Sequence, residues 1–347
     1  MKKLKVGIVG CGFIANHRHI PAFLKLKNNV ELRAMCDINE ALANSVANKF
    51  GVSNHYSSLQ SMLKNEDLDI IDICTPPGIH MQLAVEAAEF GCHVLMEKPM
   101  ALKVSDCDLM IKAANKSGVT LSIIHNELFY PVTIKAEKMV EDGQIGKFIG
   151  MRWLRLTPRD EYAAISDHWI HKLPGGILGE TGPHGIYTSL RFIGKIKNVN
   201  ILAQKISQYP WLLYDDYRIE LEGEKGISSI MISHATDRQA ATIELIGTEG
   251  LLNLDVFRMI LSHHNLNSLN KISLAFSSIS TASQIMKSLA YNTASVILGK
   301  AKFGHEMLIK NFVQNIMSNQ PPPVLPSEGR ETVKIINLII EKLDKQI

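Results

Sequence analysis

The first 124 residues alternate between short apolar runs and longer stretches in which apolar positions recur with helical spacing. The apolar runs are predicted strands and lie at residues 4–9, 30–36, 70–74, 94–96 and 119–124. The longer stretches are predicted helices and lie at residues 13–26, 40–50, 80–90 and 105–117. Strands that are apolar on both faces are typical of a parallel sheet covered by helices on both sides. We therefore expect residues 1–124 to form a doubly wound α/β domain.

From residue 125 onward the pattern changes to longer strands in which apolar and polar residues alternate. After a predicted helix at 132–141, these strands lie at residues 148–157, 199–207, 217–222, 227–234 and 242–246. Such alternation is typical of an antiparallel sheet with one face in solvent. We expect residues 125–347 to form a second, α+β domain with an open, mainly antiparallel sheet covered by helices.

Three further helices are predicted after this sheet. Residues 277–298 are rich in Ser, Ala, Ile and Leu, and such a helix either covers the sheet or meets another subunit. Residues 304–318 and 328–345 are separated by three consecutive prolines, which stop a helix. The last helix, 328–345, is a candidate to pack back on the first domain.

Composition narrows the class of protein. The 347 residues fit two domains, and the net charge of +3 comes from dispersed cations, which disfavours a nucleic acid partner. The five cysteines form no C-x-x-C pair, so we interpret them as reduced core residues of a cytoplasmic protein. Unbroken apolar runs of 18 residues are missing, so no membrane span is expected. We expect no metal either, because histidines such as His168 and His171 lack a carboxylate that would complete a familiar ligand set.

A glycine motif follows the first predicted strand. Gly10 and Gly12 are followed by Phe13, Ile14 and Ala15, the G-x-G-x-x-A form of the dinucleotide-binding fingerprint of Rossmann domains. Gly10 would make the tight turn, and Gly12 would let the backbone approach a pyrophosphate at the N-terminus of the next helix.

An acidic residue supports the same interpretation. Asp37 ends the second strand, where a carboxylate can accept hydrogen bonds from both ribose hydroxyls and would repel a 2′-phosphate. We therefore expect NAD as the cofactor, with NADP as the alternative. The competing interpretation is that Asp37 only caps the helix that begins near Asn39.

The ends of two later strands carry further candidate cofactor contacts. They are Thr75, Pro76 and His80 after one strand, and Glu97 and Lys98 after the next. Ligands of open α/β sheets bind beyond the carboxyl ends of the strands, so these residues are placed to contact the nicotinamide half. A Lys-Pro pair after a strand can also be an ordinary surface turn, and the second half of the chain decides between the two.

The glycine-rich segment 174–184 joins a carboxylate and an imidazole. Pro183 suits the first position of a helix at 186–193, which would place His184 in the first helical turn. There the helix dipole disfavours the imidazolium and keeps a neutral base available. Glu180 lies four residues before His184.

Together these residues resemble the glucose-fructose oxidoreductase and inositol dehydrogenase family, Gfo/Idh/MocA. The resemblance covers nearly the whole chain. It rests on the order and spacing of Gly10-x-Gly12-x-x-Ala15, Thr75-Pro76-x-x-x-His80, Glu97-Lys98-Pro99, the Gly-Gly to His184 segment, Gly247-Thr248-x-Gly250, His305-Glu306, Phe312, Pro323 and Gly329-Arg330.

The resemblance implies a Rossmann domain, an open-sheet domain, and a homo-oligomer. It also implies that Lys98 and His184 are catalytic, and that Glu180 stands where the family usually has aspartate. Asn126 becomes a plausible cofactor or substrate contact. Trp153 and Trp169 suit the face of a sugar ring, although tryptophan is also often core.

The implied function is hydride transfer between a nicotinamide cofactor and a hydroxyl-bearing carbon of a sugar, sugar nucleotide or cyclitol. His184 would remove the hydroxyl proton, and Lys98 would stabilise charge on the same oxygen. Two alternatives stay open. One is a non-catalytic NAD(P)-binding sensor of the same fold, and the other is a reductase of an imine or tetrapyrrole-type substrate.

Overall fold

The computed structural model describes residues 3–266, 268–299 and 303–345. The chain forms two compact units, and the first is discontinuous in sequence. It comprises the chain up to Asn126 together with Gly304–Lys334, whereas the second comprises Glu127–Phe303 and the chain from Ile335. Among the helices that the structure describes, none is long and apolar enough to cross a membrane.

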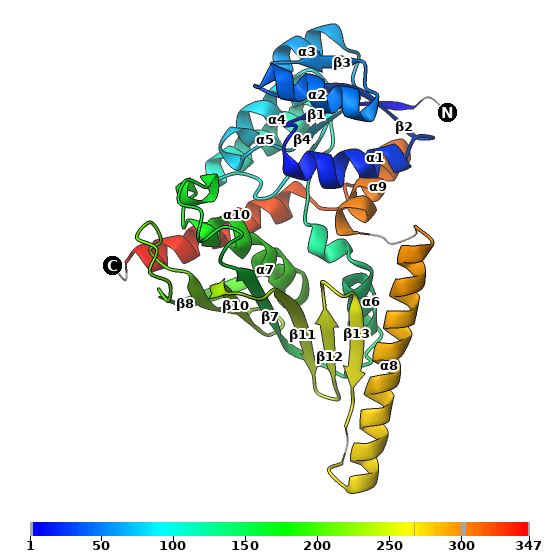
Figure 1. Cartoon of the computed structure of the whole chain (residues 1–347), viewed down its shortest axis with the longest axis vertical. Helices are drawn as coiled ribbons and strands as arrows, with labels where there is room; N and C mark the ends of the chain where they lie inside the picture. Colours follow the sequence, from blue (N-terminus) through cyan, green and yellow to red (C-terminus); the bar gives the residue numbers. More distant parts are fainter. Residues whose placement is uncertain (1–2, 267, 300–302, 346–347) are drawn as a thin grey trace. The chain divides into compact units, whose positions relative to one another are not determined.

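The first unit contains a six-stranded parallel sheet with the order β3-β2-β1-β4-β5-β6 (Figure 1). Its strands are β1 (Leu4–Val9), β2 (Val30–Cys36), β3 (Asn54–Tyr56), β4 (Ile70–Ile73), β5 (His93–Met96) and β6 (Leu121–Ile123). Its helices are α1 (Ile20–Lys25), α2 (Glu40–Phe50), α3 (Leu59–Asn65), α4 (His80–Glu89), α5 (Val104–Ser117) and α9 (Gly304–Met317). The doubly wound fold predicted from the apolar strands is confirmed.

Two elements of the first unit were not predicted, and one helix differs in form. Strand β3 has three half-buried residues at the sheet edge and α3 has seven, so both are too short for a clear periodic pattern. The helix expected at 13–26 begins as a π-helical segment, Ala15–His19, and continues as α1.

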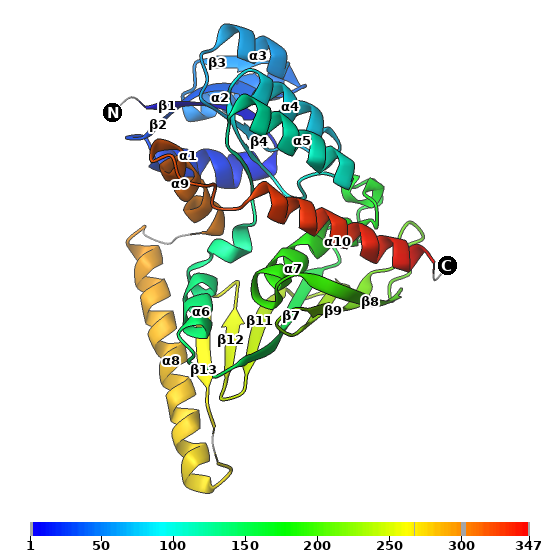
Figure 2. The same ribbon diagram turned by 180° about the vertical axis from the view of Figure 1, so that it is seen from behind.

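The second unit contains a seven-stranded sheet with the order β13-β12-β11-β7-β10-β9-β8 (Figure 2). Its strands are β7 (Phe148–Pro158), β8 (Ile196–Gln204), β9 (Asp216–Gly223), β10 (Ile227–Thr236), β11 (Ala240–Gly247), β12 (Leu251–Asp255) and β13 (Ile260–His264). Only the described pair β7 and β10 runs parallel, so the sheet is mixed and mainly antiparallel as predicted. Strands β12 and β13 were not predicted.

Helix α7 (Ile177–Ile193) packs on one face of this sheet through glycine. A Cβ on Gly185 would lie 3.0 Å from Ile230 and 3.2 Å from the ring of Trp153. The missing side chain therefore brings the helix backbone close to β7 and β10.

The prediction that Pro183 begins this helix is wrong. The helix begins at Ile177, directly after Gly175 and Gly176, whose φ angles of 72° and 56° favour glycine. Pro183 lies inside the helix, and His184 therefore lies near its middle and not in its first turn. The helix dipole therefore has little effect on His184, because it acts only within the terminal turns.

The remaining helices differ from the expected division of the chain. α6 (Pro131–Glu141) and α8 (Lys271–Ile297) belong to the second unit, whereas α9 belongs to the first. The second domain expected at 125–347 therefore does not include Gly304–Lys334. Helix α10 (Pro326–Asp344) begins in the first unit, where Arg330 pairs with Asp108, and ends in the second, where Lys342 donates to the carbonyl of Val199.

Candidate functional site

The turn after β1 requires glycine at one position and leaves space at the next. Gly10 has φ +92°, and a Cβ there would lie 2.6 Å from the carbonyl oxygen of Cys74. A Cβ on Gly12 would meet no described atom within 4 Å. The turn thus offers an open backbone surface at the end of the sheet, next to the exposed side chain of Phe13.

Asp37 fixes this turn instead of capping a helix. Its carboxylate accepts from the backbone N–H groups of Cys11 at 2.8 Å and Asn39 at 2.9 Å. The residue that caps α2 is Asn39, whose side chain accepts from the N–H of Leu42 at 3.2 Å. The capping interpretation of Asp37 is therefore wrong, and the next residue, Ile38, is 95% exposed beside it.

The loops after β4 and β5 are joined by a buried histidine. The His80 ring contacts the carbonyl oxygen of Thr75 at 2.8 Å through Nε2 and that of Pro99 at 3.1 Å through Nδ1. His80 is buried and thus positions both loops. Thr75 Oγ1 is buried without a hydrogen-bond partner in the part of the chain that the structure describes.

A buried charge cluster lies beneath Lys98. His19 contacts Asp72 at 2.8 Å through Nδ1 and Glu97 at 2.9 Å through Nε2, and His305 lies 3.3 Å from the same Glu97 oxygen. Burial lowers the pKa of His19, but the charges of Asp72 and Cys74 and their hydrogen bonds to the ring together hold that pKa well above its ordinary value. Burial raises the pKa of Glu97, but the hydrogen bonds and the charges of His19 and His305 together bring it well below the usual range. The second Glu97 oxygen accepts from the N–H of Lys98 at 3.1 Å, so the cluster fixes the backbone at this lysine.

In the second unit His184 is held through one ring nitrogen. Its Nδ1 lies 2.8 Å from the Tyr187 hydroxyl, one helical turn further along α7, and 3.5 Å from Oε1 of Glu127. The Tyr187 hydroxyl accepts from the N–H of Glu127 at 3.2 Å. The imidazole is therefore oriented by a tyrosine and a carboxylate that sequence analysis did not assign to the site.

Glu127 is the centre of this arrangement. Its carboxylate accepts from the indole N–H of Trp153 at 3.1 Å and from the guanidinium of Arg155. The partners come from β7 and α7, which lie far from Glu127 in sequence, so no local pattern could have pointed to them. The printed partners of the His184 ring are thus the Tyr187 hydroxyl and, at 3.5 Å, the Glu127 carboxylate.

A polar cavity of ≈ 210 Å³ opens beside His184 and Glu180. Its other lining residues are Arg155, Leu156, Thr157, Glu161, Tyr162, Thr181, Gln239 and Phe257. Below it, the Thr181 hydroxyl lies 3.1 Å from Nε2 of the buried His234, and burial lowers the pKa of that histidine to about 3. The cavity thus collects hydroxyl, carboxylate, amide and guanidinium groups, which suits a ligand rich in hydroxyl groups.

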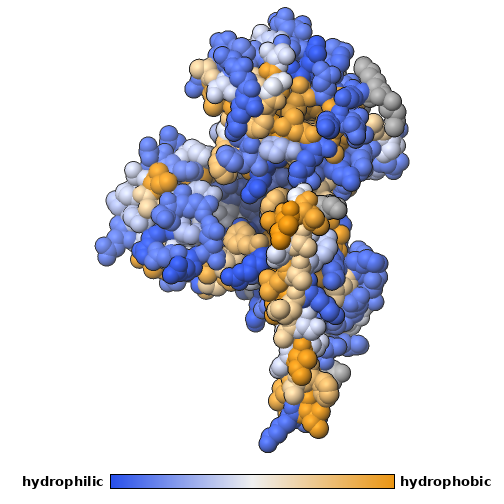
Figure 3. Space-filling model, turned by 45° about the vertical axis from the view of Figure 1, so that its right-hand side comes forward, coloured by the Kyte–Doolittle hydropathy of each residue, from blue (hydrophilic) through white to orange (hydrophobic). Residues whose placement is uncertain are grey.

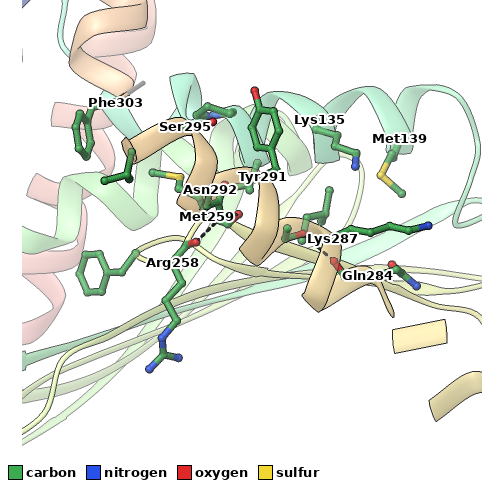
Figure 4. A pocket seen from close by; sticks show the side chains of 16 residues that line it. Lys135, Met139, Arg258, Met259, Gln284, Lys287, Tyr291, Asn292, Ser295 and Phe303 are labelled. Carbon is green, nitrogen blue, oxygen red and sulfur yellow. Dashed lines mark hydrogen bonds between the residues drawn. The ribbon is translucent and has the colours of Figure 1, made fainter. Parts of the chain in front are cut away.

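A larger cavity of ≈ 620 Å³ lies between α6, α8 and the residues after β12 (Figure 4). It is lined mostly by apolar side chains, including Met139, Met259 and Phe303. None of the predicted site residues lines it, although Phe257 borders both this cavity and the one beside His184.

The two tryptophans and Asn126 have different surroundings. Trp153 is buried in the core of the second unit, so its ring has no face open to a sugar, contrary to the expected stacking. Trp169 is partly exposed in the short helix Trp169–Lys172 and does not line the polar cavity. Asn126 is buried at the end of the first unit.

Comparison with known proteins matches both units to family models. Residues 4–125 match the oxidoreductase family with an NAD-binding Rossmann fold, and residues 133–253 match the GFO/IDH/MocA C-terminal domain.

Among curated relatives, the levoglucosan dehydrogenase of Pseudarthrobacter phenanthrenivorans is 28% identical over 60% of this chain and 56% of its own length. Oxidoreductase P35 of Formosa agariphila is 28% identical over 57% of this chain and 63% of its own length. The match thus spans less than two-thirds of these relatives. The D-apiose dehydrogenase of Paraburkholderia graminis is 26% identical over 73% of this chain and 68% of its own length.

Solved structures share the fold over nearly the entire chain. The WlbA dehydrogenase from Bordetella pertussis, in complex with NADH and UDP-GlcNAcA, has a TM-score of 0.82 at 21% identity, covering 100% of this chain and 97% of that one. A levoglucosan dehydrogenase in complex with NADH has a TM-score of 0.81 at 19% identity, covering 99% of this chain and 98% of that one. The chain belongs to the Gfo/Idh/MocA family of oxidoreductases with an NAD-binding Rossmann fold.

Proposed function

We propose that this protein transfers a hydride between NAD and a hydroxyl-bearing carbon of a sugar, sugar nucleotide or cyclitol. The observation that carries the proposal is the polar cavity beside His184 and Glu180, in a chain whose first unit has an NAD-binding fold. The named relatives include dehydrogenases of levoglucosan, D-apiose and myo-inositol, which are all polyhydroxylated compounds.

The residues of the first unit fit a dinucleotide. The open space over Gly12 leaves room for a pyrophosphate, and the unpartnered buried hydroxyl of Thr75 is a hydrogen-bonding group that a bound cofactor or water can satisfy. Asp37 presents a carboxylate beside the turn, which favours NAD over NADP. We assign further cofactor contacts to Gly10, Phe13, Ile14, Pro76, Lys98 and Asn126, with His80 and Glu97 acting through the loops that they hold. When bound, the nicotinamide accepts or donates the hydride.

We assign the proton transfer to His184. Its Nδ1 is engaged with Tyr187 and lies near Glu127, which leaves the proton exchange with the substrate hydroxyl to Nε2. A tyrosine hydroxyl can donate or accept, so Tyr187 can bond the histidine in both of its neutral tautomers. The Glu127 carboxylate stabilises the positive charge that the ring gains when it takes the proton.

Lys98 and Glu180 complete the proposed chemistry. Lys98 would hydrogen-bond the reacting oxygen and stabilise the negative charge that develops there during oxidation. Glu180 lines the same cavity as His184, and we assign it to a neighbouring substrate hydroxyl. In the reductive direction the same groups act in reverse, with His184 returning the proton.

The test measures NADH absorbance with a panel of sugars, inositols and nucleotide sugars. We expect turnover of at least one compound, and losses of about 10²-fold or more in kcat for Lys98→Ala and His184→Ala with NAD affinity kept near wild type for His184→Ala. Lys103→Ala, at an exposed lysine of the first unit, is the matched control and should keep full activity.

Other outcomes would favour the alternatives. NAD binding without turnover across the panel would favour a non-catalytic sensor. Consumption of NADH by imines or linear tetrapyrroles, with sugars unchanged, would favour a reductase of those substrates.

Two further properties belong to the proposal. All five cysteines are buried and form no disulfide within the described residues, which suits a reducing compartment and a cytoplasmic location. We also propose that the chain forms a homo-oligomer.

A further inference from the structure

Helix α8 turns its polar side inward. The half-buried residues of this helix are small or polar with the exception of Ile285, namely Ser273, Ser277, Thr281, Gln284, Ile285, Ser288, Asn292 and Ser295. Gln284 accepts from the N–H of His263 at 2.8 Å. Asn292 donates to the carbonyls of Arg258 and Met259 at 2.8 and 2.9 Å (Figure 4). Polar contacts therefore fix the helix along the edge strand β13.

The opposite side of α8 is apolar and exposed. Within Lys271–Ile297, all of which the structure describes, no side chain is buried. The outward apolar side chains are 65–78% exposed and lie in patches along the helix, with polar positions between them (Figure 3). This strip comprises Ile272, Phe276, Ile279, Met286, Val296 and Ile297. A surface helix normally has the reverse arrangement, so this strip is the signature of a covered interface.

The outward strip has a seven-residue repeat. One position of the repeat is occupied by Ile272, Ile279, Met286 and Thr293, and the position three residues later holds Ala275, Ala282, Leu289 and Val296. This is the spacing of helices that pack side by side with knobs in holes. In the first half of the helix, Ile272 and Ile279 alternate with Ala275 and Ala282, and the small alanine side chains let a second helix approach closely. A helix lying on a membrane needs no such alternation, so the pattern favours a protein partner.

The same repeat is complementary to itself when two copies run antiparallel. Pairing each residue i with residue 568 − i places Ile272 opposite Val296, Ile279 opposite Leu289 and Met286 opposite Ala282, so that each large side chain faces an apolar partner. The twofold axis then passes near Gln284.

Charge also favours the antiparallel arrangement. Residues 256–305 contain no Asp or Glu. The lysines of α8 therefore cannot form ion pairs with carboxylates of this segment in a second copy, and the direction of pairing decides what they face. Antiparallel pairing instead places Lys271 beside the C-terminal end of the partner helix, where the carbonyl groups carry partial negative charge. Parallel pairing would set Lys271 against Lys271 and Lys287 against Lys287.

We propose that α8 is a dimerisation helix, which pairs antiparallel with α8 of a second copy of this chain about an axis near Gln284. A helix of 27 residues is about 40 Å long. With a contact strip about 10 Å wide on each helix, the pair buries on the order of 800 Å², which is below the range of about 1,200–2,000 Å² for stable interfaces and typical of weak, transient ones. The contact alone therefore predicts a dimer that dissociates at micromolar concentrations.

Sedimentation velocity across a concentration series of the full chain tests the contact. We expect Ile279→Glu/Met286→Glu to weaken self-association at least tenfold, because each copy places two carboxylates in the strip. Ser280→Glu, also exposed but beside the strip, is the matched control and should associate like wild type. Circular dichroism confirms that the variants fold. Equal association of the double variant and the control would overturn the proposal.

Single cysteines test the direction of pairing without interference, because the native cysteines are buried. Ser283→Cys lies beside the axis and should form a disulfide-linked dimer with itself under mild oxidation. In antiparallel pairing the two copies of residue 272 lie about 36 Å apart, at 1.5 Å per residue. Ile272→Cys should therefore crosslink only when mixed with Val296→Cys.

Self-crosslinking of Ile272→Cys would overturn the antiparallel arrangement. A chain that stays monomeric at protein concentrations 100-fold above the expected micromolar range would overturn the interface. Co-sedimentation of the monomer with vesicles of anionic phospholipid would also overturn it, because the strip would then be a membrane contact.

Discussion

Neutralising Glu127 should destabilise the second unit far more than neutralising an exposed carboxylate on the same sheet. Glu127→Gln keeps the shape of the side chain but removes the charge that faces Arg155, Trp153 and His184. The Glu127 side chain is 2% exposed and that of Arg155 is 16% exposed, so little water reaches the pair. Arg155 also has a buried Nε without a hydrogen-bond partner in the described part of the protein.

The size of the effect follows from this burial. Removing one partner of a buried ion pair costs about 3–5 kcal/mol, and the remaining exposure of Arg155 favours the lower value. The second unit contains about 190 residues, for which each kcal/mol shifts the melting temperature by about 2–4 °C. We therefore expect a decrease of about 6–12 °C.

Differential scanning calorimetry measures this shift, and Glu244→Gln is the matched control. Glu244 on β11 pairs with the exposed Arg152 on the neighbouring strand β7. Such surface pairs contribute about 0–1 kcal/mol to the free energy of unfolding. Adding Arg155→Met to Glu127→Gln should restore part of the lost stability, because no unpaired charge remains. Equal melting temperatures for Glu127→Gln and Glu244→Gln would refute the reasoning.

Three other predictions concern the cofactor turn and acid stability. Gly10→Ala should lower the melting temperature by several degrees, because Gly10 has a φ of +92° and the new Cβ would lie 2.6 Å from a carbonyl oxygen. Gly12→Ala should fold normally and lose NAD affinity in calorimetric titration. Equal melting temperatures of the two variants would contradict this prediction. Asp37→Ala should weaken NAD binding by about 10- to 100-fold and reduce the preference for NAD over NADP, and an unchanged ratio of the two affinities would exclude the assigned role. Burial lowers the pKa of His125 and His234 to about 3, so the folded state binds fewer protons than the unfolded state and stability falls as pH drops below about 6.5. At pH 5 each histidine should lower the free energy of unfolding, measured with urea, by about 2 kcal/mol. A free energy of unfolding that stays constant from pH 7 to pH 5 would contradict the assignment.

Local patterns were sufficient for most of the first unit. Residues 4–9 and 30–36 are strands with the predicted bounds, because each is an apolar run that ends at a turn. The glycine turn was predictable for the same reason, since Gly10 and Asp37 follow consecutive strands of one sheet. Their roles depend on neighbours in the sheet, which the strand order supplies.

The second unit shows where local patterns fail. Proline at the first helical position is common, so Pro183 was taken as a helix start, yet the helix begins six residues earlier at the glycine pair. Glu127 was not recognised because its partners, Trp153, Arg155 and Tyr187, lie 26 to 60 residues away and meet only when β7 and α7 pack together. Contacts of this kind are set by tertiary packing and not by sequence spacing.

The discontinuity of the first unit has a consequence for how the chain folds during synthesis. Leu308 and Phe312 of α9 are fully buried in that unit, although they are made long after its last strand, β6. From Asn126 to Lys334 the ribosome adds 208 residues, which takes about 10–40 s at 5–20 residues per second. For most of that interval the nascent first unit lacks α9 and exposes the surface of α1 and the preceding π-helical segment that α9 later covers. A truncated chain that ends at residue 126 should therefore aggregate, and the nascent chain should be a good client for a holding chaperone until α9 emerges.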